Sequence, residues 1–354
     1  SLRESFISKK SEPKKSEPGK LYAVASGTGF FINASGNIVS NNHVIDSCGS
    51  VKVHYNGIIK PLILPSDETN GTGTCNSSLF VEDDTIHLIM RHVEYTLYHS
   101  EGEQKYQTIW EGPLSYYHKE NCRDLKTNNF YCKLDNDTLS IKKYHKIDTS
   151  KLDVKPIWQF IGLEDARLVK WDEKYYLCGV RRDTTTNGQG RMELSEIDIK
   201  DESVKEINRN RIEVDDIHSY CEKNWMPILD KPFHFVKWTN PTEVVKVNLE
   251  TNMSERIFIS NCKENVPYEI RGGTPLIRWN ENQYICICHD VDYRPKNHNG
   301  HKDSDYYHRF IIFNDDFSIK YVKLFNKILK TNGKLIIDSN IEGKHNYKII
   351  NKKK

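Results

Sequence analysis

The chain has 354 residues, 37% hydrophobic and 28% charged, and its 51 Lys and Arg residues nearly balance 49 Asp and Glu residues, giving a formal net charge of +2. This length allows one large domain or two modest ones, and the near-neutral charge argues against a protein that binds duplex nucleic acid by neutralising phosphates. The sequence has no run of about 18 apolar residues and no apolar leader segment, so we expect no membrane span, no export signal and a cytoplasmic location.

The nine cysteines are an odd number and include no Cys-x-x-Cys pair. This pattern indicates reduced thiols rather than a disulfide framework or a zinc site, and we expect no bound metal. Cys286 and Cys288 flank a single residue and therefore share one face of a predicted strand. We expect them to pack in the core, with a reactive role as the alternative.

Residues 1–20 contain the unit KKSEP twice in tandem and show no apolar periodicity, so they are predicted to be a disordered linker. From residue 21 on, short apolar runs rich in β-branched and aromatic residues are separated by Asn, Asp and Gly. Such a pattern is typical of β-strands joined by tight turns.

Residues 26–57, SGTGFFINASGNIVSNNHVIDSCGSVKVHYNG, resemble the opening of trypsin-like serine proteases of the HtrA type. The resemblance places His43 at the position of the catalytic histidine, which needs a serine nucleophile and an aspartate partner. No segment like Gly-Asn-Ser-Gly-Gly follows, and the pattern changes near residue 61. We therefore expect residues 21–60 to be a truncated protease-like fragment without peptidase activity.

After residue 61, four segments share one layout, in which a polar or small-residue cluster leads into an apolar strand, a turn and an aromatic-rich strand. They are NSSLFVEDDTIHLIMR (76–91), EDARLVKWDEKYYLCGVRR (164–182), NWMPILDKPFHFVKW (224–238) and GGTPLIRWNENQYICICHD (272–290). The later segments start about 50–60 residues apart, the size of one four-stranded propeller blade. The longer first interval predicts an inserted loop around residues 100–130.

We therefore predict an all-β chain in which residues 61–354 form a five-bladed-type β-propeller, with an incomplete last blade in residues 334–354. A β-sandwich is the alternative, but it would not repeat the layout in phase. Innermost blade strands line a central channel, so the polar clusters that open the repeats converge there. These clusters and the ends of the second strands contribute Asn76, Arg91, Glu164, Asp165, Arg167, Arg181, Arg182, Lys223, Asn224, Arg271 and His289. A channel with these charges predicts a polar, partly anionic ligand such as a sugar, a sugar phosphate or phosphate.

Two of the segments carry a family resemblance. GLEDARLVKWDEKYYLCGVRRD (162–183) is similar to the Glu-Asp-Pro-Arg motif of five-bladed propeller glycosidases and mannoside phosphorylases, with Ala166 where the family usually has Pro. EKNWMPI (222–228) resembles the Lys-Asn-Trp segment of the phosphorylases. The resemblance implies cleavage of a glycosidic bond in an oligosaccharide or glycoside by hydrolysis or phosphorolysis. It implies no cofactor, with inorganic phosphate as the co-substrate of a phosphorylase.

The resemblance also implies residue roles. Asp165 matches the catalytic general acid, with Glu164 as the neighbouring carboxylate. Arg91 and Lys223 match cations that hold phosphate, and His289 is a looser match to a histidine from a later blade. The remaining predicted substrate-binding residues come from the polar clusters and are Asn76, Arg167, Asn224 and Arg271.

Each of these assignments has a purely structural alternative. Glu164 and Asp165 alternatively cap a strand turn and pair with Arg167, and the cations alternatively form ion pairs between blades. Trp225 is assigned with equal weight to sugar contact and to packing. At the level of function, the alternatives are a non-catalytic sugar-binding propeller linked to glycan synthesis and an inactive serine-peptidase remnant.

Overall fold

The computed structural model describes residues 29–31, 38–40, 62, 64–69, 74–83, 85–97, 116–117, 124–216, 218–267, 269–294, 303–324, 327–331, 334–339 and 346–350. Within these ranges the regular structure is β-strand apart from one short helix, α1 (Ser66–Thr69). No helix in the described ranges is long and apolar enough to cross a membrane. The predicted all-β class is therefore confirmed for the described residues.

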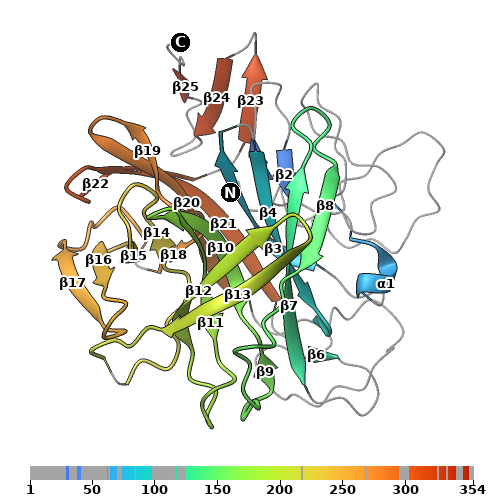
Figure 1. The fold of residues 1–354 in the computed structure, drawn as a ribbon. Helices are drawn as coiled ribbons and strands as arrows, with labels where there is room; N and C mark the ends of the chain where they lie inside the picture. The colour runs from blue at the N-terminus through green and yellow to red at the C-terminus, as the bar shows by residue number, and fades with distance from the viewer. Residues whose placement is uncertain are drawn as a thin grey trace.

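Four antiparallel sheets are arranged around a common centre like the blades of a propeller (Figure 1). Blade 1 consists of β3 (Thr74–Glu82), β4 (Thr85–Val93), β7 (Leu125–Leu134) and β8 (Ile141–Lys146), with β9 (Phe160–Ile161) running parallel to β7. Blade 2 consists of β10 (Glu164–Trp171), β11 (Lys174–Arg181), β12 (Arg191–Lys200) and β13 (Ser203–Arg211).

Blades 3 and 4 repeat this order. Blade 3 consists of β14 (Met226–Pro227), β15 (His234–Trp238), β16 (Glu243–Val247) and β17 (Ser254–Ile259). Blade 4 consists of β18 (Arg271–Gly272), β20 (Gln283–Arg294), β21 (Asp303–Asn314) and β22 (Ile319–Leu324), and β19 (Ile277–Asn280) also pairs with β20. The four sequence repeats thus coincide with the first two strands of the four blades, as predicted. The insertion predicted around residues 100–130 corresponds to the 94–124 connection between β4 and β7, which contains the pair β5 (Thr96–Leu97) and β6 (Tyr116–Tyr117); residues 125–130 belong to β7 instead.

The prediction of five blades is corrected to four. After blade 4 the described strands β23 (Lys327–Thr331), β24 (Lys334–Ser339) and β25 (Asn346–Ile350) form a separate three-stranded sheet rather than a fifth four-stranded blade. The sequence pattern at this end consists of strands without the polar cluster that opens each of the other repeats.

The predicted protease-like fragment is described only at β1 (Gly29–Phe31) and β2 (Ile38–Ser40), which pair as an antiparallel two-stranded sheet. This pairing is common to many β-hairpins and does not identify a protease. His43 and the predicted linker 1–20 lie outside the described residues.

Hydrophobic layers between neighbouring blades form the core. Ile89 of blade 1 packs in one cluster with Leu168 of blade 2. Trp171 of blade 2 meets Phe235 of blade 3 edge-on, with ring centroids 5.5 Å apart, and both side chains are buried. Each blade therefore needs its neighbour to bury its apolar faces, as expected when residues alternate between the two faces of a strand.

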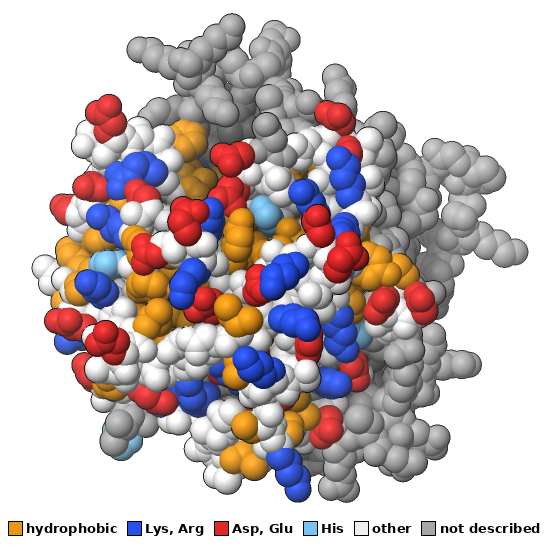
Figure 2. Space-filling view, viewed as in Figure 1, with side chains coloured by type: hydrophobic (Ala, Val, Ile, Leu, Met, Phe, Trp, Pro, Cys, Tyr) orange, Lys and Arg blue, Asp and Glu red, His pale blue; other side chains and the backbone are white. Residues whose placement is uncertain are grey.

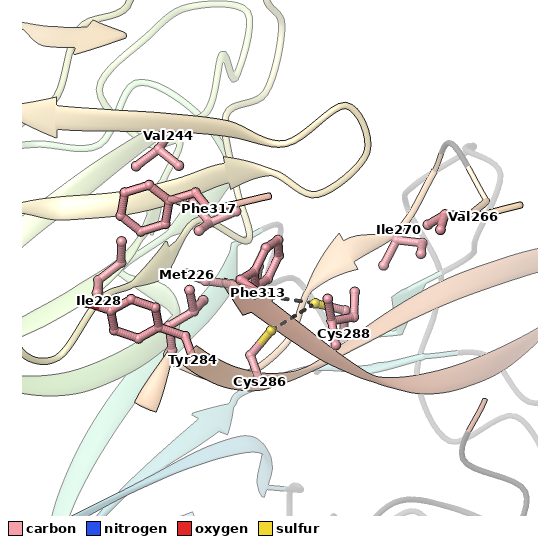
Figure 3. Packing of buried hydrophobic residues seen from close by; sticks show 13 residues of the cluster. Met226, Ile228, Val244, Val266, Ile270, Tyr284, Cys286, Cys288, Phe313 and Phe317 are labelled. Atoms are coloured by element: carbon pink, nitrogen blue, oxygen red, sulfur yellow. Dashed lines mark hydrogen bonds between the residues drawn. The ribbon is translucent and has the colours of Figure 1, made fainter. Parts of the chain in front are cut away.

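The layer between blades 3 and 4 contains three sulfur atoms (Figure 3). The Sγ atoms of Cys286 and Cys288 lie 3.6 Å apart on one face of β20, and the Cys288 Sγ is 3.4 Å from the Met226 Sδ. All three side chains are buried among hydrophobic residues. This confirms the prediction that the two cysteines pack in the core.

Blade 2 also contains a buried ionic network. The Arg181 Nε donates to the Glu193 carboxylate over 2.7 Å, and Arg209 binds both Glu193 and Glu206. Glu193 and Glu206 are almost completely buried. Each of the two carboxylates has a cationic partner, as buried charges require.

Candidate functional site

Three successive blades begin with a polar residue in the left-handed backbone region. Asn76 in β3 has φ 46°, Asp165 in β10 has φ 53° and Asn224 just before β14 has φ 62°. The ladders of β3 and β10 are interrupted by a register shift at these residues, which is typical of a β-bulge. Asn and Asp are the side chains that tolerate this conformation best after glycine. The bulges break the strict alternation of side chains where the inner strands begin.

The carboxylates of Glu164 and Asp165 bind the same guanidinium group. The Arg91 Nη1 lies 2.6 Å from the Asp165 Oδ1, and its Nη2 lies 3.4 Å from the Glu164 Oε2. The Nη2 also donates to the Tyr95 hydroxyl over 2.9 Å and to the Thr127 Oγ1 over 3.2 Å. The side chain of Arg91 is 7% exposed, that of Glu164 16% and that of Asp165 26%. The pair is thus held firmly from blade 1 while part of Asp165 remains accessible.

The two neighbouring carboxyls have opposite pKa shifts. At Asp165 burial, which raises the pKa, is outweighed by the charge of Arg91 and by a 2.6 Å hydrogen bond from the Asn76 Nδ2, so the pKa falls to about 2. At Glu164 burial dominates and raises the pKa, although Arg91 opposes this shift. Ionised Asp165 adds to the rise at Glu164. Asp165 therefore prefers the charged form and Glu164 is the carboxyl that more readily carries a proton.

Arg182 is a further cation at this site. Its guanidinium lies 4.8 Å from the ring centroid of Phe160 and 5.5 Å from that of Tyr220, and it donates to the Tyr220 hydroxyl and the Gly188 carbonyl, each over 2.9 Å. Its charge lowers the pKa of Glu164. Within the described part of the chain, no carboxylate pairs with Arg182. The site therefore contains a positioned cation whose charge is not neutralised by a described acidic partner.

Two residues of blade 3, Lys223 and Asn224, also lie at the centre. Lys223 is exposed, makes no ion pair with any described residue, and its charge lowers the pKa of both central carboxyls. The Asn224 carbonyl oxygen lies so close to Gly272 that a Cβ atom there would be only 2.0 Å away. Blades 3 and 4 thus approach each other closely where their first strands begin.

Arg167 binds main-chain groups of the neighbouring blades. It donates to the Gly273 carbonyl over 2.7 Å, to the Trp225 carbonyl over 2.9 Å and to the Gly272 carbonyl over 3.3 Å. Its side chain is buried, and burial lowers its pKa. Arg167 therefore joins blade 2 to blades 3 and 4, and its charge also contributes to the low pKa of Asp165.

His289 and Arg271 occupy paired positions in blade 4. Burial of His289, with the nearby His308 and Arg167, lowers the pKa of its imidazole to about 4, while Asp165 opposes the shift. The imidazole is therefore neutral at physiological pH. It lies close enough to the centre to interact electrostatically with Asp165.

The structure thus brings the predicted site residues of all four blades together, but not in the predicted pairs. The central carboxylates bind Arg91, not Arg167, so Arg91 forms an ion pair between blades. Trp225 is 1% exposed and its indole Nε1 donates to the Glu222 carboxylate, which assigns it to packing and not to sugar contact.

Sequence reasoning did not identify Tyr95 or Thr127, and it placed Arg182 in the predicted channel without a role of its own. Arg182 was visible as the second of two adjacent arginines at the end of β11, but adjacent residues of an extended chain point to opposite faces. Arg181 enters the buried network of blade 2, whereas Arg182 acts on Glu164. The doubled arginine was the only sequence signal, and it did not show which of the two faces the centre.

No protein-family model matches the chain, and no curated protein sequence matches it. Among solved structures, the chain is similar to a putative glycosidase from Bacteroides thetaiotaomicron, with a TM-score of 0.44 and 10% identity over 76% of this chain and 83% of the other. It is also similar to a family 117 glycoside hydrolase produced by Zobellia galactanivorans, with a TM-score of 0.41 and 11% identity over 78% and 76% of the two chains. A third is a mannose phosphorylase from Leishmania mexicana in complex with phosphate ion, with a TM-score of 0.39 and 10% identity over 79% and 84%.

Proposed function

We propose that this chain cleaves a glycosidic bond, by hydrolysis or phosphorolysis, at Glu164 and Asp165. The main support is the pair of carboxyls on one guanidinium whose pKa values are shifted in opposite directions. Glycosidic cleavage needs one group to protonate the leaving oxygen, and carboxyls with separated pKa values are the usual way to provide it. The partial exposure of Asp165 leaves room for a substrate to reach the pair.

In this proposal Glu164 donates the proton to the glycosidic oxygen and Asp165 stays ionised. The resemblance of the sequence implies the opposite assignment, with Asp165 as the acid. A carboxyl with a pKa of about 2 is almost fully ionised at neutral pH and is a poor proton donor in the free protein. Glu164, whose pKa is raised by burial, is the better donor, and ionised Asp165 then orients a sugar hydroxyl or stabilises positive charge at the reacting carbon.

Arg182 and Lys223 are the residues that would hold an attacking phosphate. Arg182 acts on Glu164 and Lys223 acts on both central carboxyls, and neither cation forms an ion pair with a described residue. Arg91, the cation that the sequence resemblance assigns to phosphate, is already bound to both carboxylates. Phosphorolysis needs an anion site of this kind beside a single acid, whereas inverting hydrolysis needs a second carboxylate that accepts the proton of the attacking water.

The test is a phosphate-dependent activity screen over manno-, gluco- and galacto-oligosaccharides with wild-type protein, Glu164→Gln and Asp165→Asn. Loss of a positioned proton donor lowers turnover by about 10²–10⁴-fold. Glu173→Gln is the matched control, because Glu173 is an exposed carboxylate on the β10–β11 turn of the same blade. Release of a sugar 1-phosphate identifies phosphorolysis. Turnover that survives in both central variants would show that this pair does not carry the reaction.

A non-catalytic sugar-binding propeller is the second candidate. It is favoured by the tight 2.6 Å contact between Arg91 and Asp165, because a carboxylate neutralised in this way can accept hydrogen bonds from sugar hydroxyls without taking part in catalysis. This alternative predicts oligosaccharide binding with no product after long incubation.

A further inference from the structure

A polar cavity lies between blades 1 and 2. It has a volume of about 240 Å³ and is separate from the central carboxylates. Its walls come from the β3–β4 turn, from β7 and β8, and from β11 with the β12–β13 turn. The His145 Nε2 contacts the Asp201 carbonyl oxygen at 2.9 Å and so joins the two blades at this cavity.

Polar groups in the cavity wall are fixed by hydrogen bonds. The Tyr175 hydroxyl donates to one oxygen of Glu82, and Lys170 binds the other oxygen at 2.6 Å. The His87 Nδ1 lies 2.8 Å from the Tyr131 hydroxyl, and the His87 ring is 5.8 Å from the Tyr175 ring. The hydroxyl and imidazole groups of these side chains are therefore already oriented before a ligand binds. This lowers the conformational entropy that the side chains lose on binding.

The charges in the wall are balanced. Three lysines, Lys133, Lys143 and Lys200, face three acidic residues, Glu82, Asp83 and Asp201. Burial lowers the pKa of His87, which keeps its imidazole neutral. A cavity without excess charge does not select an anion or a cation. The cavity wall offers both hydrogen-bond donors and hydrogen-bond acceptors. Hydroxyl groups can donate and accept hydrogen bonds, so a ligand rich in hydroxyl groups suits this wall.

We propose that this cavity is a second binding site that takes one neutral pyranose ring of a glycan. Its volume is below the range of about 300–1,000 Å³ found for drug-sized ligands, which fits a single sugar ring. The wall combines the rings of Tyr131, Tyr175 and His87 with charged side chains, and polar groups held in place by hydrogen bonds can fix the orientation of a ligand. The site binds without cleaving, and it does not depend on bond cleavage at the central carboxylates.

The test compares variants that fill the cavity with one that does not. Lys143→Trp and Lys133→Trp place an indole in the cavity from β8 and β7. Lys142→Trp is the matched control, because Lys142 is the next residue on β8, pairs with Asp135 and does not line the cavity. Binding of the α- and β-methyl pyranosides of mannose, glucose, galactose and xylose is measured by saturation-transfer NMR, after circular dichroism has confirmed the fold of each variant.

We expect at least one pyranoside to bind the wild-type chain. Its saturation-transfer signal should be at least fivefold smaller in both filled variants. The signal should remain in Lys142→Trp and in Arg182→Ala, which changes only the central site. Binding that is lost in Arg182→Ala but unchanged in the filled variants would overturn the proposal. The absence of binding by every pyranoside would also overturn the proposal. This holds even if inorganic phosphate shows ³¹P line broadening that only the filled variants abolish. Inactivity of the chain on glycosides would leave these outcomes unchanged, so the two proposals fail separately.

Discussion

The pairing of Asp165 with Arg91 gives the most direct test of the electrostatics at the centre. In Arg91→Met the guanidinium that binds both carboxylates is removed, while a side chain of similar length fills part of its volume. Asp165 then keeps the effect of burial, which raises its pKa, and loses the largest effect that lowers it. We expect its pKa to rise from about 2 to above the ordinary value of 3.8.

The shift from 3.8 to about 2 in the wild-type chain corresponds to about 2–3 kcal/mol of interaction that favours the ionised carboxylate. Removing one partner of a fully buried ion pair costs about 3–5 kcal/mol. Because Asp165 is 26% exposed, water compensates for part of this loss, and we expect the free energy of unfolding at pH 7 to fall by about 2–3 kcal/mol.

The sign of the pH dependence follows from the same shift. In the wild-type chain the folded pKa of Asp165 lies below the unfolded value, so its contribution to stability is complete above about pH 4 and is lost as the pH falls towards about 2. In Arg91→Met the folded pKa lies above the unfolded value. Protonation of Asp165 then favours the folded state, and its contribution to the pH dependence changes sign.

The assay is a carboxyl ¹³C NMR titration of chains labelled at Asp, with the Asp165 resonance assigned by its absence in Asp165→Asn. Chemical denaturation between pH 2 and pH 7 measures the stability of the same variants. Arg91→Lys is the matched control, because it keeps a positive charge but not the two-pronged contact, and we expect an intermediate pKa. A pKa that stays within about half a unit of 2 in Arg91→Met would refute the role of this ion pair.

Four further predictions concern stability. Arg167→Met removes three hydrogen bonds to main-chain carbonyls of blades 3 and 4, and denaturant titration should show a loss of about 3–4 kcal/mol; a change below 1 kcal/mol would contradict this role. Gly272→Ala places a Cβ atom 2.0 Å from the Asn224 carbonyl oxygen, so its thermal midpoint should fall and the unfolding free energy should decrease by about 2 kcal/mol or more. Glu193→Gln removes the buried carboxylate that Arg181 and Arg209 share, while Asp183 still binds Arg181 and Glu206 still binds Arg209, so the unfolding free energy should fall by about 1–2 kcal/mol; an unchanged denaturation midpoint would show that the network relaxes. His289 has a pKa of about 4 in the folded state against an ordinary value of 6.5, so as the pH falls the unfolded state is protonated first. The free energy of unfolding should therefore decrease as the pH drops from about 6.5 to about 4, and His289→Gln should remove this slope from the pH–stability curve.

The positions of the blades were predictable from the sequence because a blade begins with a local pattern. A polar cluster, a strand, a turn and a second strand lie within about 20 residues, so neighbouring residues carry the whole signal. The C-terminal strands β23–β25 lack the opening cluster, and there the prediction of a fifth blade was wrong. The pattern of apolar residues predicted that strands are present at this end of the chain, but it did not show that they form a separate sheet.

The contacts at the site were less predictable because they join residues that are distant in the sequence. Arg91 and Asp165 are 74 positions apart, and no sequence pattern indicates that this arginine binds the carboxylates while Arg167 binds carbonyl groups. Trp225 follows Lys223 and Asn224 but lies in the layer between blades, because residues near a strand alternate between two faces. Sequence proximity to Lys223 and Asn224 therefore left sugar contact and packing equally weighted for Trp225, and the structure shows packing.

The distribution of charge also changes the meaning of the small net charge of the chain. Figure 2 shows basic and acidic side chains interspersed over the viewed surface, in agreement with a net charge of only +2. At the centre the balance is different, because the two carboxylates are accompanied by four cationic residues, which are Arg91, Arg167, Arg182 and Lys223. Arg91 is neutralised by the carboxylates, and Arg167 is bound by carbonyl groups, which leaves a local excess of positive charge. A local excess attracts an anion even when the whole protein is nearly neutral. If the chain cleaves glycosides as proposed, we therefore expect phosphate rather than water to attack, and release of a sugar 1-phosphate would show this.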